Sequence, residues 1–201
     1  MDIKHLRKQM RQQRQALSLK QQQAAAQQLC AQLTALSSVQ AAQRIALYLV
    51  NDGEIDPSLF MHWAFKRGVD CYLPVIGERK GSTSTDAPMH FAAFHADSEL
   101  VNNRFGIPEP VAADADLLDA AQLDLMLMPL VAFDDRGNRI GMGGGFYDRT
   151  LAFKAQQTYH QPPVLIGLAH SFQQLDQISP AAWDVPLDGI ASDQNAWLFA
   201  C

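Results

Sequence analysis

The sequence predicts an α/β domain of three layers, with helices on both faces of a largely parallel sheet and further helices ahead of it. Short apolar runs alternate with helix-forming stretches, and several runs are apolar on both faces, which is typical of strands buried in a parallel sheet. No internal repeat or linker divides the chain, and a hydrophobic content of 48% is enough for one core. We therefore expect a single domain over residues 1–201.

Two helices are predicted over residues 1–36, packing on that domain. Residues 2–36 contain no Gly or Pro, and Ser18 can cap a second helix after a break at 17–18. At about 100° per residue, the first helix has an apolar stripe beside a basic one. The apolar stripe consists of Ile3, Leu6, Met10 and Leu17, and the basic stripe of Lys4, Arg7, Lys8, Arg11 and Arg14. We expect the apolar edge to pack on the domain and the basic edge to lie over a site on the surface of the domain.

Five strands are predicted after these helices, at 45–50, 69–75, 90–94, 123–128 and 164–169. Crossover helices fit at 57–67, where Trp63 and Phe65 are expected in the core, and at 147–153. Ligands of such sheets bind beyond the carboxyl ends of the strands. The loops that follow the strands are therefore where a site is expected.

Charge is divided unevenly along the chain. The net charge is -5, but residues 1–44 carry seven Lys/Arg against Asp2 alone (+6), and the remainder carries nine against twenty (-11). The acidic remainder argues against a nucleic-acid partner, whereas an anion site near the N-terminus stays open.

The sequence also argues against a membrane or secreted protein. No run approaches the roughly 20 apolar residues that cross a bilayer, and the basic opening lacks the apolar core of a secretory signal. Neither the cysteines nor the histidines have a metal-ligand spacing, and the cysteines form no disulfide framework. These residues are Cys30, Cys71, Cys201, His5, His62, His90, His95, His160 and His170. We expect a cytoplasmic monomer with structural or surface histidines.

The first candidate loop follows the predicted strand 45–50. Asn51, Glu54 and Asp56 come directly after this strand and before a predicted helix, where carboxylates can meet a ligand. The same segment fits an Asx or proline turn in which Asp56 caps the helix. The segment alone leaves both interpretations open.

The second candidate loop is richer in information. Four glycines in the five positions 141–145 run into a predicted helix, so backbone N–H groups and the helix N-terminus can surround an anion. It is not a dinucleotide fingerprint, because Phe146 stands where that pattern needs glycine, and the Walker ending is absent. Glycines alone can simply permit close packing. The flanking side chains favour a phosphate site, because Arg139 and Arg149 can neutralise phosphates and Asp148 can bind a divalent cation.

Two weaker candidates lie elsewhere. Glu109 stands in the proline-rich loop 104–110 and could face a ligand, although a packed surface turn is the commoner explanation. Asp184 follows Pro180 and could be a second cation ligand or a helix cap.

Residues 129–148 resemble the signature of the 5-formyltetrahydrofolate cyclo-ligase family, also called methenyltetrahydrofolate synthetases. That run reads Pro-Leu-Val-Ala-Phe-Asp-Asp-Arg-Gly-Asn-Arg-Ile-Gly-Met-Gly-Gly-Gly-Phe-Tyr-Asp. Further segments occur in the family's order and at about its spacing, so that the resemblance covers nearly the whole chain. They are Lys4-His-Leu-Arg7-Lys8, Glu54-Ile-Asp56-Pro57, 105–110, 166–169 and Trp183-Asp184.

The resemblance implies a Rossmann-like fold and an enzyme that uses ATP and Mg²⁺. Its members convert 5-formyltetrahydrofolate into 5,10-methenyltetrahydrofolate through a phosphorylated formyl intermediate, releasing ADP and phosphate. It implies ATP contacts at Lys4, Arg7, Lys8, Arg139, Ile140, Gly141, Met142, Gly143, Gly144, Gly145, Phe146 and Tyr147. It implies catalysis by Arg139, Tyr147 and Asp148, Mg²⁺ ligands at Asp148 and Asp184, and substrate contacts at Asn51, Glu54, Asp56 and Glu109.

The chain departs from the family pattern at Leu130, Met142, Phe146 and His170. None of these changes removes a charge that the reaction needs, and Tyr147 still supplies a phenol beside Phe146. Two rival functions are less consistent with the residues. An RNA-binding module needs aromatic residues interleaved with a wider basic face. An isomerase or CoA-transferase-like enzyme on the same fold gives no reason for the basic stripe.

Overall fold

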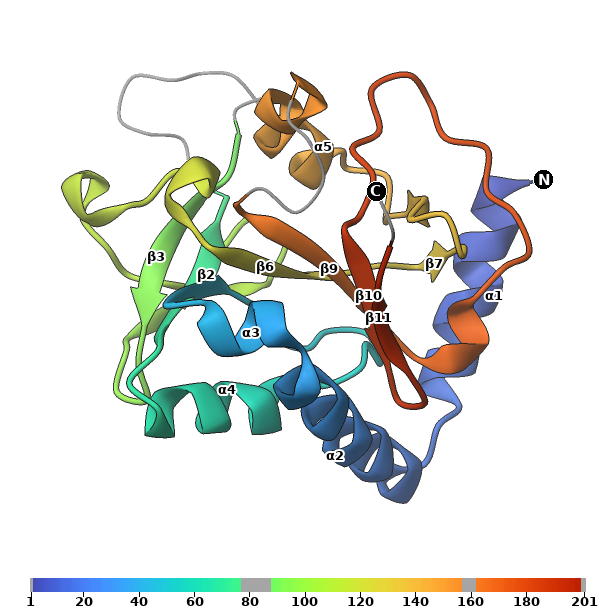
Figure 1. Ribbon diagram of the computed structural model, residues 1–201, viewed down its shortest axis with the longest axis horizontal. Helices are drawn as coiled ribbons and strands as arrows, with labels where there is room; N and C mark the ends of the chain where they lie inside the picture. Colours follow the sequence, from blue (N-terminus) through green and yellow to red (C-terminus); the bar gives the residue numbers. More distant parts are fainter. Residues whose placement is uncertain (1, 77–87, 157–161, 200–201) are drawn as a thin grey trace.

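The computed structural model describes residues 2–76, 88–156 and 162–199. At its centre lies a seven-stranded sheet with the order β11-β10-β9-β6-β1-β2-β3 (Figure 1). Its strands are β1 Arg44–Ala46, β2 Asp70–Val75, β3 His90–Phe94, β6 Leu125–Pro129, β9 Val164–Ala169, β10 Gly189–Ser192 and β11 Ala196–Leu198. The strands from β10 to β2 run parallel, whereas the two edge strands β3 and β11 are antiparallel to their neighbours. The largely parallel α/β prediction is confirmed.

Two short hairpins stand beside the sheet. One pairs β4, Leu100–Asn102, with β5, Pro108–Pro110, and the other pairs β7, Ala132–Phe133, with β8, Arg139–Ile140. The second hairpin leads into the glycine loop.

The helices cover the sheet unequally. Their bounds are α1 Ile3–Gln15, α2 Leu19–Ala35, α3 Ser37–Ala41, α4 Ser58–Lys66 and α5 Phe146–Thr150. Helices α2, α3 and α4 lie on one side of the sheet, while α5 lies on the other (Figure 1). Short 3₁₀ turns lie at Asp114–Asp116, Ala120–Gln122, Ala152–Gln156 and Ser171–Gln173. No helix in the described ranges is both long and apolar enough to cross a bilayer.

The predicted break between the first two helices is confirmed. Ser18 caps α2, because its Oγ accepts from the Gln21 N–H at 3.3 Å while the Gln21 side chain accepts from the Ser18 N–H at 2.9 Å. This reciprocal capping box satisfies two N–H groups that a helix start otherwise leaves unbonded.

The core alternates across the sheet as strand geometry requires. Leu125 and Leu127 of β6 pack with α2 and α4, whereas Met126 and Met128 pack in a second cluster on the opposite face. All four are at most 1% exposed, and burying such a side chain stabilises the fold by about 1.5–3 kcal/mol. Trp63, with its ring centroid 5.3 Å from that of Phe60, packs on the first cluster, as predicted.

Some elements differ from the prediction. The strand expected at 45–50 ends at Ala46, although the next N–H, of Leu47, still donates to Tyr72 O at 2.9 Å. The helix expected at 147–153 is divided into the short α5 and a 3₁₀ turn. Strands β10 and β11 were absent from the prediction, because each is only three or four residues long and depends on its neighbours.

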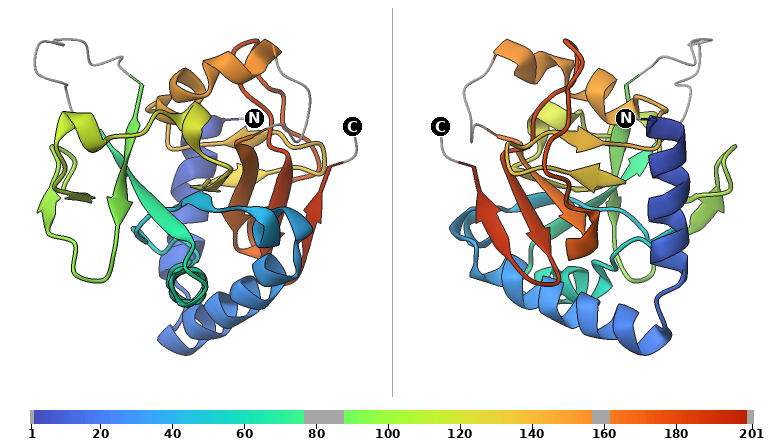
Figure 2. Two further views of the ribbon diagram at one scale, coloured as in Figure 1. Left: turned by 60° about the vertical axis from the view of Figure 1, so that its left-hand side comes forward. Right: turned by 90° about the vertical axis from the view of Figure 1, so that its right-hand side faces the viewer.

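The strand order reverses direction between β1 and β6, which makes their carboxyl ends a topological switch point. From β1 the chain proceeds through α4 to β2 on one side, whereas β6 leads to β9 on the other. At such a switch point the loops beyond the two carboxyl ends diverge and leave room for a ligand. Helix α1 lies across this edge, beside the β7–β8 hairpin (Figure 2).

Candidate active site

The docking of α1 depends on a small apolar cluster. Leu6 and Met10 are buried against Val131, Ala132, Ile140 and Ile178, which lie on and around the β7–β8 hairpin. As predicted, an apolar edge of the first helix docks on the domain. Ile3, however, is 45% exposed, and Leu17 lies beyond the end of the helix.

The basic edge of α1 contacts the glycine loop. Arg7 Nε donates to Gly141 O at 2.8 Å, across 134 residues of chain. Gly143 has φ +100°, and a Cβ at this position would lie 3.1 Å from the Arg7 Cζ. Gly143 is therefore required both by its backbone conformation and by the approach of the guanidinium.

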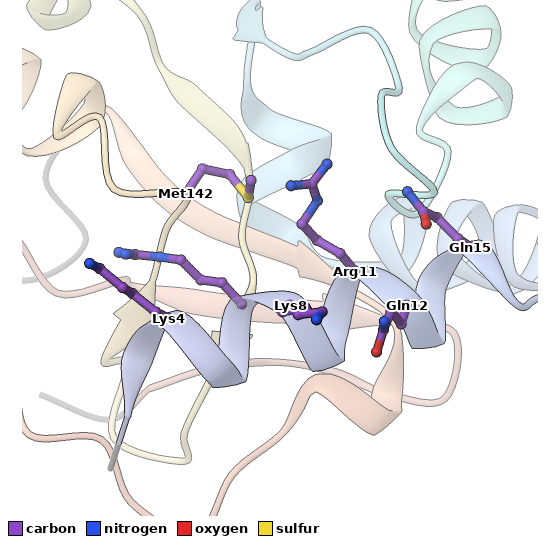
Figure 3. Close-up of a pocket in the computed structure, with 7 residues that line it drawn as sticks. Lys4, Lys8, Arg11, Gln12, Gln15 and Met142 are labelled. Carbon is purple, nitrogen blue, oxygen red and sulfur yellow. The ribbon is translucent and has the colours of Figure 1, made fainter.

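A pocket of about 360 Å³ lies along this contact. Its lining consists of Lys4, Arg7, Lys8, Arg11, Gln12, Gln15 and Met142. Figure 3 shows Lys4 and Arg11 extending from α1 toward the side on which Met142 lies. The lining has four cations and no carboxylate, although one of the four, Arg11, pairs with Asp52 outside it. Such a lining suits a polyanion such as a triphosphate.

Arg139, Asp148 and the segment around Asp184 form the next part of the site. Arg139 Nη2 lies 2.6 Å from Asp148 Oδ1, and Arg139 also donates to Val185 O. The Val185 N–H faces the same Asp148 oxygen at 3.5 Å, and Asp184 Oδ2 accepts from Ala181 N at 2.8 Å. The two predicted metal ligands thus belong to neighbouring segments.

Asp148 and Asp184 can supply only part of the coordination shell of a Mg²⁺ ion. The described residues contain no group of three or more His, Cys, Asp or Glu side chains placed to hold a metal ion. Mg²⁺ ordinarily takes one or two carboxylates and completes its shell with water and substrate phosphates. Asp148 and Asp184, as two carboxylates on neighbouring segments, fit that pattern.

Glu54 occupies the centre of the loop after β1. Its side chain is 14% exposed, its Oε2 accepts from the Asn51 N–H at 3.2 Å, and burial raises its pKa from 4.5 to about 7. Burial and the charge of Glu54 also raise the pKa of Tyr147, whereas Arg139 lowers it. Glu54 and Arg139 thus act in opposite directions on the same phenol of α5.

Arg14 was predicted on the basic stripe, and that prediction is wrong. The side chain is buried, 1% exposed, with Nη2 3.3 Å from Asp52 Oδ2 and Nη1 3.9 Å from Glu54 Oε1. The spacing explains the error, because Leu6, Met10 and Arg14 are four residues apart and share one helix face. This four-residue spacing was the sequence signal that could have predicted the burial of Arg14.

Asp56 and Glu109 have clear structural bonds. Asp56 Oδ1 accepts from the Ser58 N–H at 2.8 Å, so the predicted Asx turn is present, but the N-cap of α4 is Pro57 and not Asp56. Glu109 is 7% exposed, and its Oε1 accepts from Ile76 N at 2.7 Å and from Asn103 Nδ2 at 2.6 Å. A direct substrate contact by either residue stays a prediction.

The loop before Glu109 nevertheless reaches the site. The ring centroid of Phe105, 54% exposed, lies 5.8 Å from that of Phe146 in an edge contact. The Arg149 guanidinium lies over the ring of Phe146, with its Cζ 5.1 Å from the ring centroid. Phe146 therefore packs and positions the end of the glycine loop without needing a hydroxyl.

One histidine has the structural role that was predicted. His170 is buried, and its Nε2 lies 3.2 Å from Gly53 O, which is a structural bond. Cys30 and Cys71 are free thiols. His160 and Cys201 lie outside the described residues.

Comparison with known proteins gives a consistent family. The model of the 5-formyltetrahydrofolate cyclo-ligase family matches residues 2–193. The chain is 36% identical over 187 residues to 5-formyltetrahydrofolate cyclo-ligase of Escherichia coli, covering 93% of this chain and 98% of that protein. It is 38% identical over 146 residues to the enzyme of the same name from Haemophilus influenzae, covering 73% of each.

A solved structure agrees with these sequence relatives. The fold superposes on the NMR structure of Aquifex aeolicus 5,10-methenyltetrahydrofolate synthetase with a TM-score of 0.80 at 26% identity, covering 98% of this chain and 93% of that chain. Together with the glycine loop and its basic helix, these matches show that the chain belongs to the 5-formyltetrahydrofolate cyclo-ligase family.

Proposed function

We propose that the protein catalyses the ATP- and Mg²⁺-dependent cyclisation of 5-formyltetrahydrofolate to 5,10-methenyltetrahydrofolate, with release of ADP and phosphate. The observation that carries this proposal is the contact of Arg7 with Gly141 and Gly143, which assembles a cationic pocket from the two ends of the predicted nucleotide site. The names of the family and of its relatives support the same activity.

ATP fits the pocket beside α1. Lys4, Lys8 and the Arg7 guanidinium would neutralise the phosphates, while the N–H groups of residues 141–145 surround them. Arg139, in β8 immediately before this loop, would then neutralise the transferring phosphate.

Mg²⁺ would be held by Asp148 and Asp184 together with the phosphates. When bound there it supplies positive charge that neutralises the phosphate oxygens. Arg139, which already pairs with Asp148, keeps that carboxylate oriented.

The reaction needs an activated formyl oxygen. This oxygen attacks the γ-phosphorus of ATP and ADP leaves, so the formyl carbon carries a phosphate as its leaving group. The 10-position nitrogen then bonds to that carbon, the C–O bond breaks, phosphate leaves and the nitrogen loses its proton. Such chemistry depends on positioning and charge neutralisation, which explains why the site needs no Ser or Cys nucleophile.

Glu54 would face the pterin or formyl end of the folate. A carboxyl with a pKa of about 7 can accept the proton that the 10-position nitrogen releases near neutral pH. Asn51 and Asp56 flank it on the same loop and would complete the folate side of the site.

The test is a single absorbance assay. Purified protein is mixed with 5-formyltetrahydrofolate and Mg²⁺, with and without ATP, and methenyl absorbance is followed together with ADP release. We expect both signals to rise only with ATP and in equal amounts. Absence of an ATP-dependent rise contradicts the proposal, and the isomerase or CoA-transferase-like alternative predicts no methenyl signal with or without ATP. We also propose that the protein works as a monomer in the cytoplasm. Free thiols at Cys30 and Cys71 are consistent with a reducing compartment.

A further inference from the structure

Arg14 is the largest side chain with less than 2% of its surface exposed. A buried guanidinium is costly unless acceptors surround it. Its partners come from two different loops, one after β1 and one after β6. Arg14 is therefore a fixed positive charge between these two loops and does not line the pocket along α1.

The first set of partners lies in the loop after β1. Arg14 Nη2 is 3.3 Å from Asp52 Oδ2, and Arg11 and Gln15 donate to the same carboxylate. Gly53, at φ +71°, approaches so closely that a Cβ there would lie 2.9 Å from the Arg14 carbonyl carbon. Three residues on one side of α1 therefore hold this loop directly under the helix.

Two further side chains, one from α2 and one after β9, stabilise the contact between Arg14 and Gly53. Gln22 Nε2 bridges Arg14 O at 3.3 Å and Gly53 O at 3.4 Å, and His170 Nε2 lies 3.2 Å from Gly53 O. Buried polar groups that share several bonds have one preferred arrangement. The position of residues 52–54 is therefore determined by α1 and by the segment after β9.

The second partner lies in the loop after β6. Arg14 Nη1 is 3.4 Å from Leu130 O, which Gln173 Nε2 also contacts at 2.9 Å. Leu130 immediately follows β6 on the way to the glycine loop. Arg14 thus connects the loops that follow the two strands at the topological switch point.

We propose that Arg14 is a positioning residue of the folate site: it joins the loop after β1 to the start of the loop after β6 and so holds Glu54 toward the substrate. The inference rests on the proposed function for the identity of that substrate. The connection itself is independent of it, because it depends only on the distances between Arg14, Asp52, Glu54 and Leu130.

Several ionisable groups surround Glu54. Arg14 approaches from α1, Asp52 and Asp56 belong to its own loop, Tyr48 follows β1 and Tyr147 belongs to α5. Among them only Arg14 acts to lower the pKa of Glu54 through its charge, whereas burial and Asp52 raise it. Removing the guanidinium should therefore move the titration of Glu54 to higher pH.

The experiment compares wild type, Arg14→Gln and Arg14→Lys. In Arg14→Gln we expect KM for 5-formyltetrahydrofolate to rise at least about 10-fold and KM for ATP less than about 3-fold. The limb of the kcat/KM pH profile that depends on Glu54 should move up by about one pH unit or more. Arg14→Lys keeps the charge without the two-armed geometry, so KM for the folate should rise while that limb stays close to wild type.

A second measurement does not require activity. The side-chain carboxyl of Glu54, labelled with ¹³C and assigned by its loss in Glu54→Gln, should titrate near pH 7 in wild type and higher in Arg14→Gln. If wild type lacks the proposed activity, this titration still tests the coupling, so that the two failures are distinguishable. An unchanged titration in Arg14→Gln overturns the inference.

Leu33→Ala is the stability control. Leu33 belongs to α2 and is fully buried in the core cluster on that side of the sheet. Its truncation should destabilise the fold without changing either loop. Its KM values and pH profile should match wild type. If it reproduces the folate KM and pH changes of Arg14→Gln, those changes reflect general destabilisation and the positioning role is rejected.

Discussion

Arg7 Nε donates to Gly141 O at 2.8 Å, which makes the first helix and the glycine loop one structural unit although 134 residues separate them. The basic stripe and the glycine loop each suit an anion poorly alone, because the stripe is one exposed helix edge and the loop is mostly backbone. Together, the basic stripe and the glycine loop can contact a bound anion from two sides. The proposed nucleotide pocket therefore exists only while α1 is docked.

Gly143→Ala should weaken ATP binding. A side chain at φ +100° is strained, and its Cβ would lie 3.1 Å from the Arg7 guanidinium, so loop and arginine must separate. We expect KM for ATP to rise at least about 10-fold with a smaller effect on the folate. Steady-state kinetics with each substrate varied in turn provides the measurement.

Gly68→Ala is the matched control for that strain. Gly68 also has a positive φ, +69°, but a Cβ there meets no atom within 4 Å, and it follows α4 away from the site. It should lose about 1 kcal/mol of stability and keep the wild-type KM for ATP. An equal rise in KM in both variants would contradict the proposed contact.

Asp148→Asn should remove ATP-dependent turnover while leaving the fold intact. The variant keeps the size of the side chain but loses the charge that we assign to Mg²⁺ and that pairs with Arg139 at 2.6 Å. We expect kcat to fall about 100-fold or more at ordinary Mg²⁺ concentrations, with partial recovery at high Mg²⁺.

The Mg²⁺ dependence separates two explanations of that loss. If Asp148 only orients Arg139, added Mg²⁺ will not restore turnover, and the metal assignment is wrong. Asp70→Asn removes an exposed carboxylate at the start of β2, at the other end of the strands, and should behave as wild type.

Much of this site could be anticipated from local sequence. The five predicted strands are apolar enough to be buried, and parallel strands present their carboxyl ends at one edge, so the loops at 51–57 and 141–145 were expected together. The apolar positions Leu6 and Met10 likewise predicted a docked edge of α1. These conclusions required only periodicity and the order of elements.

Other features depend on contacts that local sequence does not encode. Strand β3 is antiparallel to β2, and β10 and β11 are short strands whose pairing is a tertiary property. Arg14 was assigned to the basic edge by residue type, whereas its buried acceptors, Asp52 and Leu130 O, lie 38 and 116 residues away. Burial of a cation becomes predictable only when its partners are placed.

Glu54→Gln should change how stability depends on pH. The folded protein raises the pKa of Glu54 from 4.5 to about 7, so it retains this proton more tightly than the unfolded chain does. The stability from this group is complete below about pH 4.5 and is lost as pH rises toward 7, a difference of roughly 3 kcal/mol. Wild type should therefore lose about that much relative to Glu54→Gln between pH 4.5 and pH 8.

Urea unfolding at several pH values measures that difference. The charge interaction between Arg14 and Glu54 exists only when Glu54 is ionised, so it is already part of the pKa of Glu54. The change of stability with pH, and not the absolute stability, is therefore diagnostic. Glu99→Gln removes an exposed carboxylate and should run parallel to wild type. Parallel curves for wild type and Glu54→Gln would show that Glu54 does not carry a raised pKa.

Met10→Ala tests whether the docking of α1 controls nucleotide binding. Met10 is 5% exposed in the small cluster with Val131 and Ile140, and its truncation costs about 2–5 kcal/mol. Because this cluster is separate from the two larger ones, most of the loss should appear as local opening of α1. We expect faster hydrogen exchange in α1, unchanged protection in α2 and a raised KM for ATP, because Arg7 leaves Gly141 whenever the helix opens. Leu33→Ala should weaken the whole fold yet preserve KM. If KM for ATP stays at the wild-type value while exchange in α1 accelerates, the helix is a structural cover and the pocket beside it is not the nucleotide site.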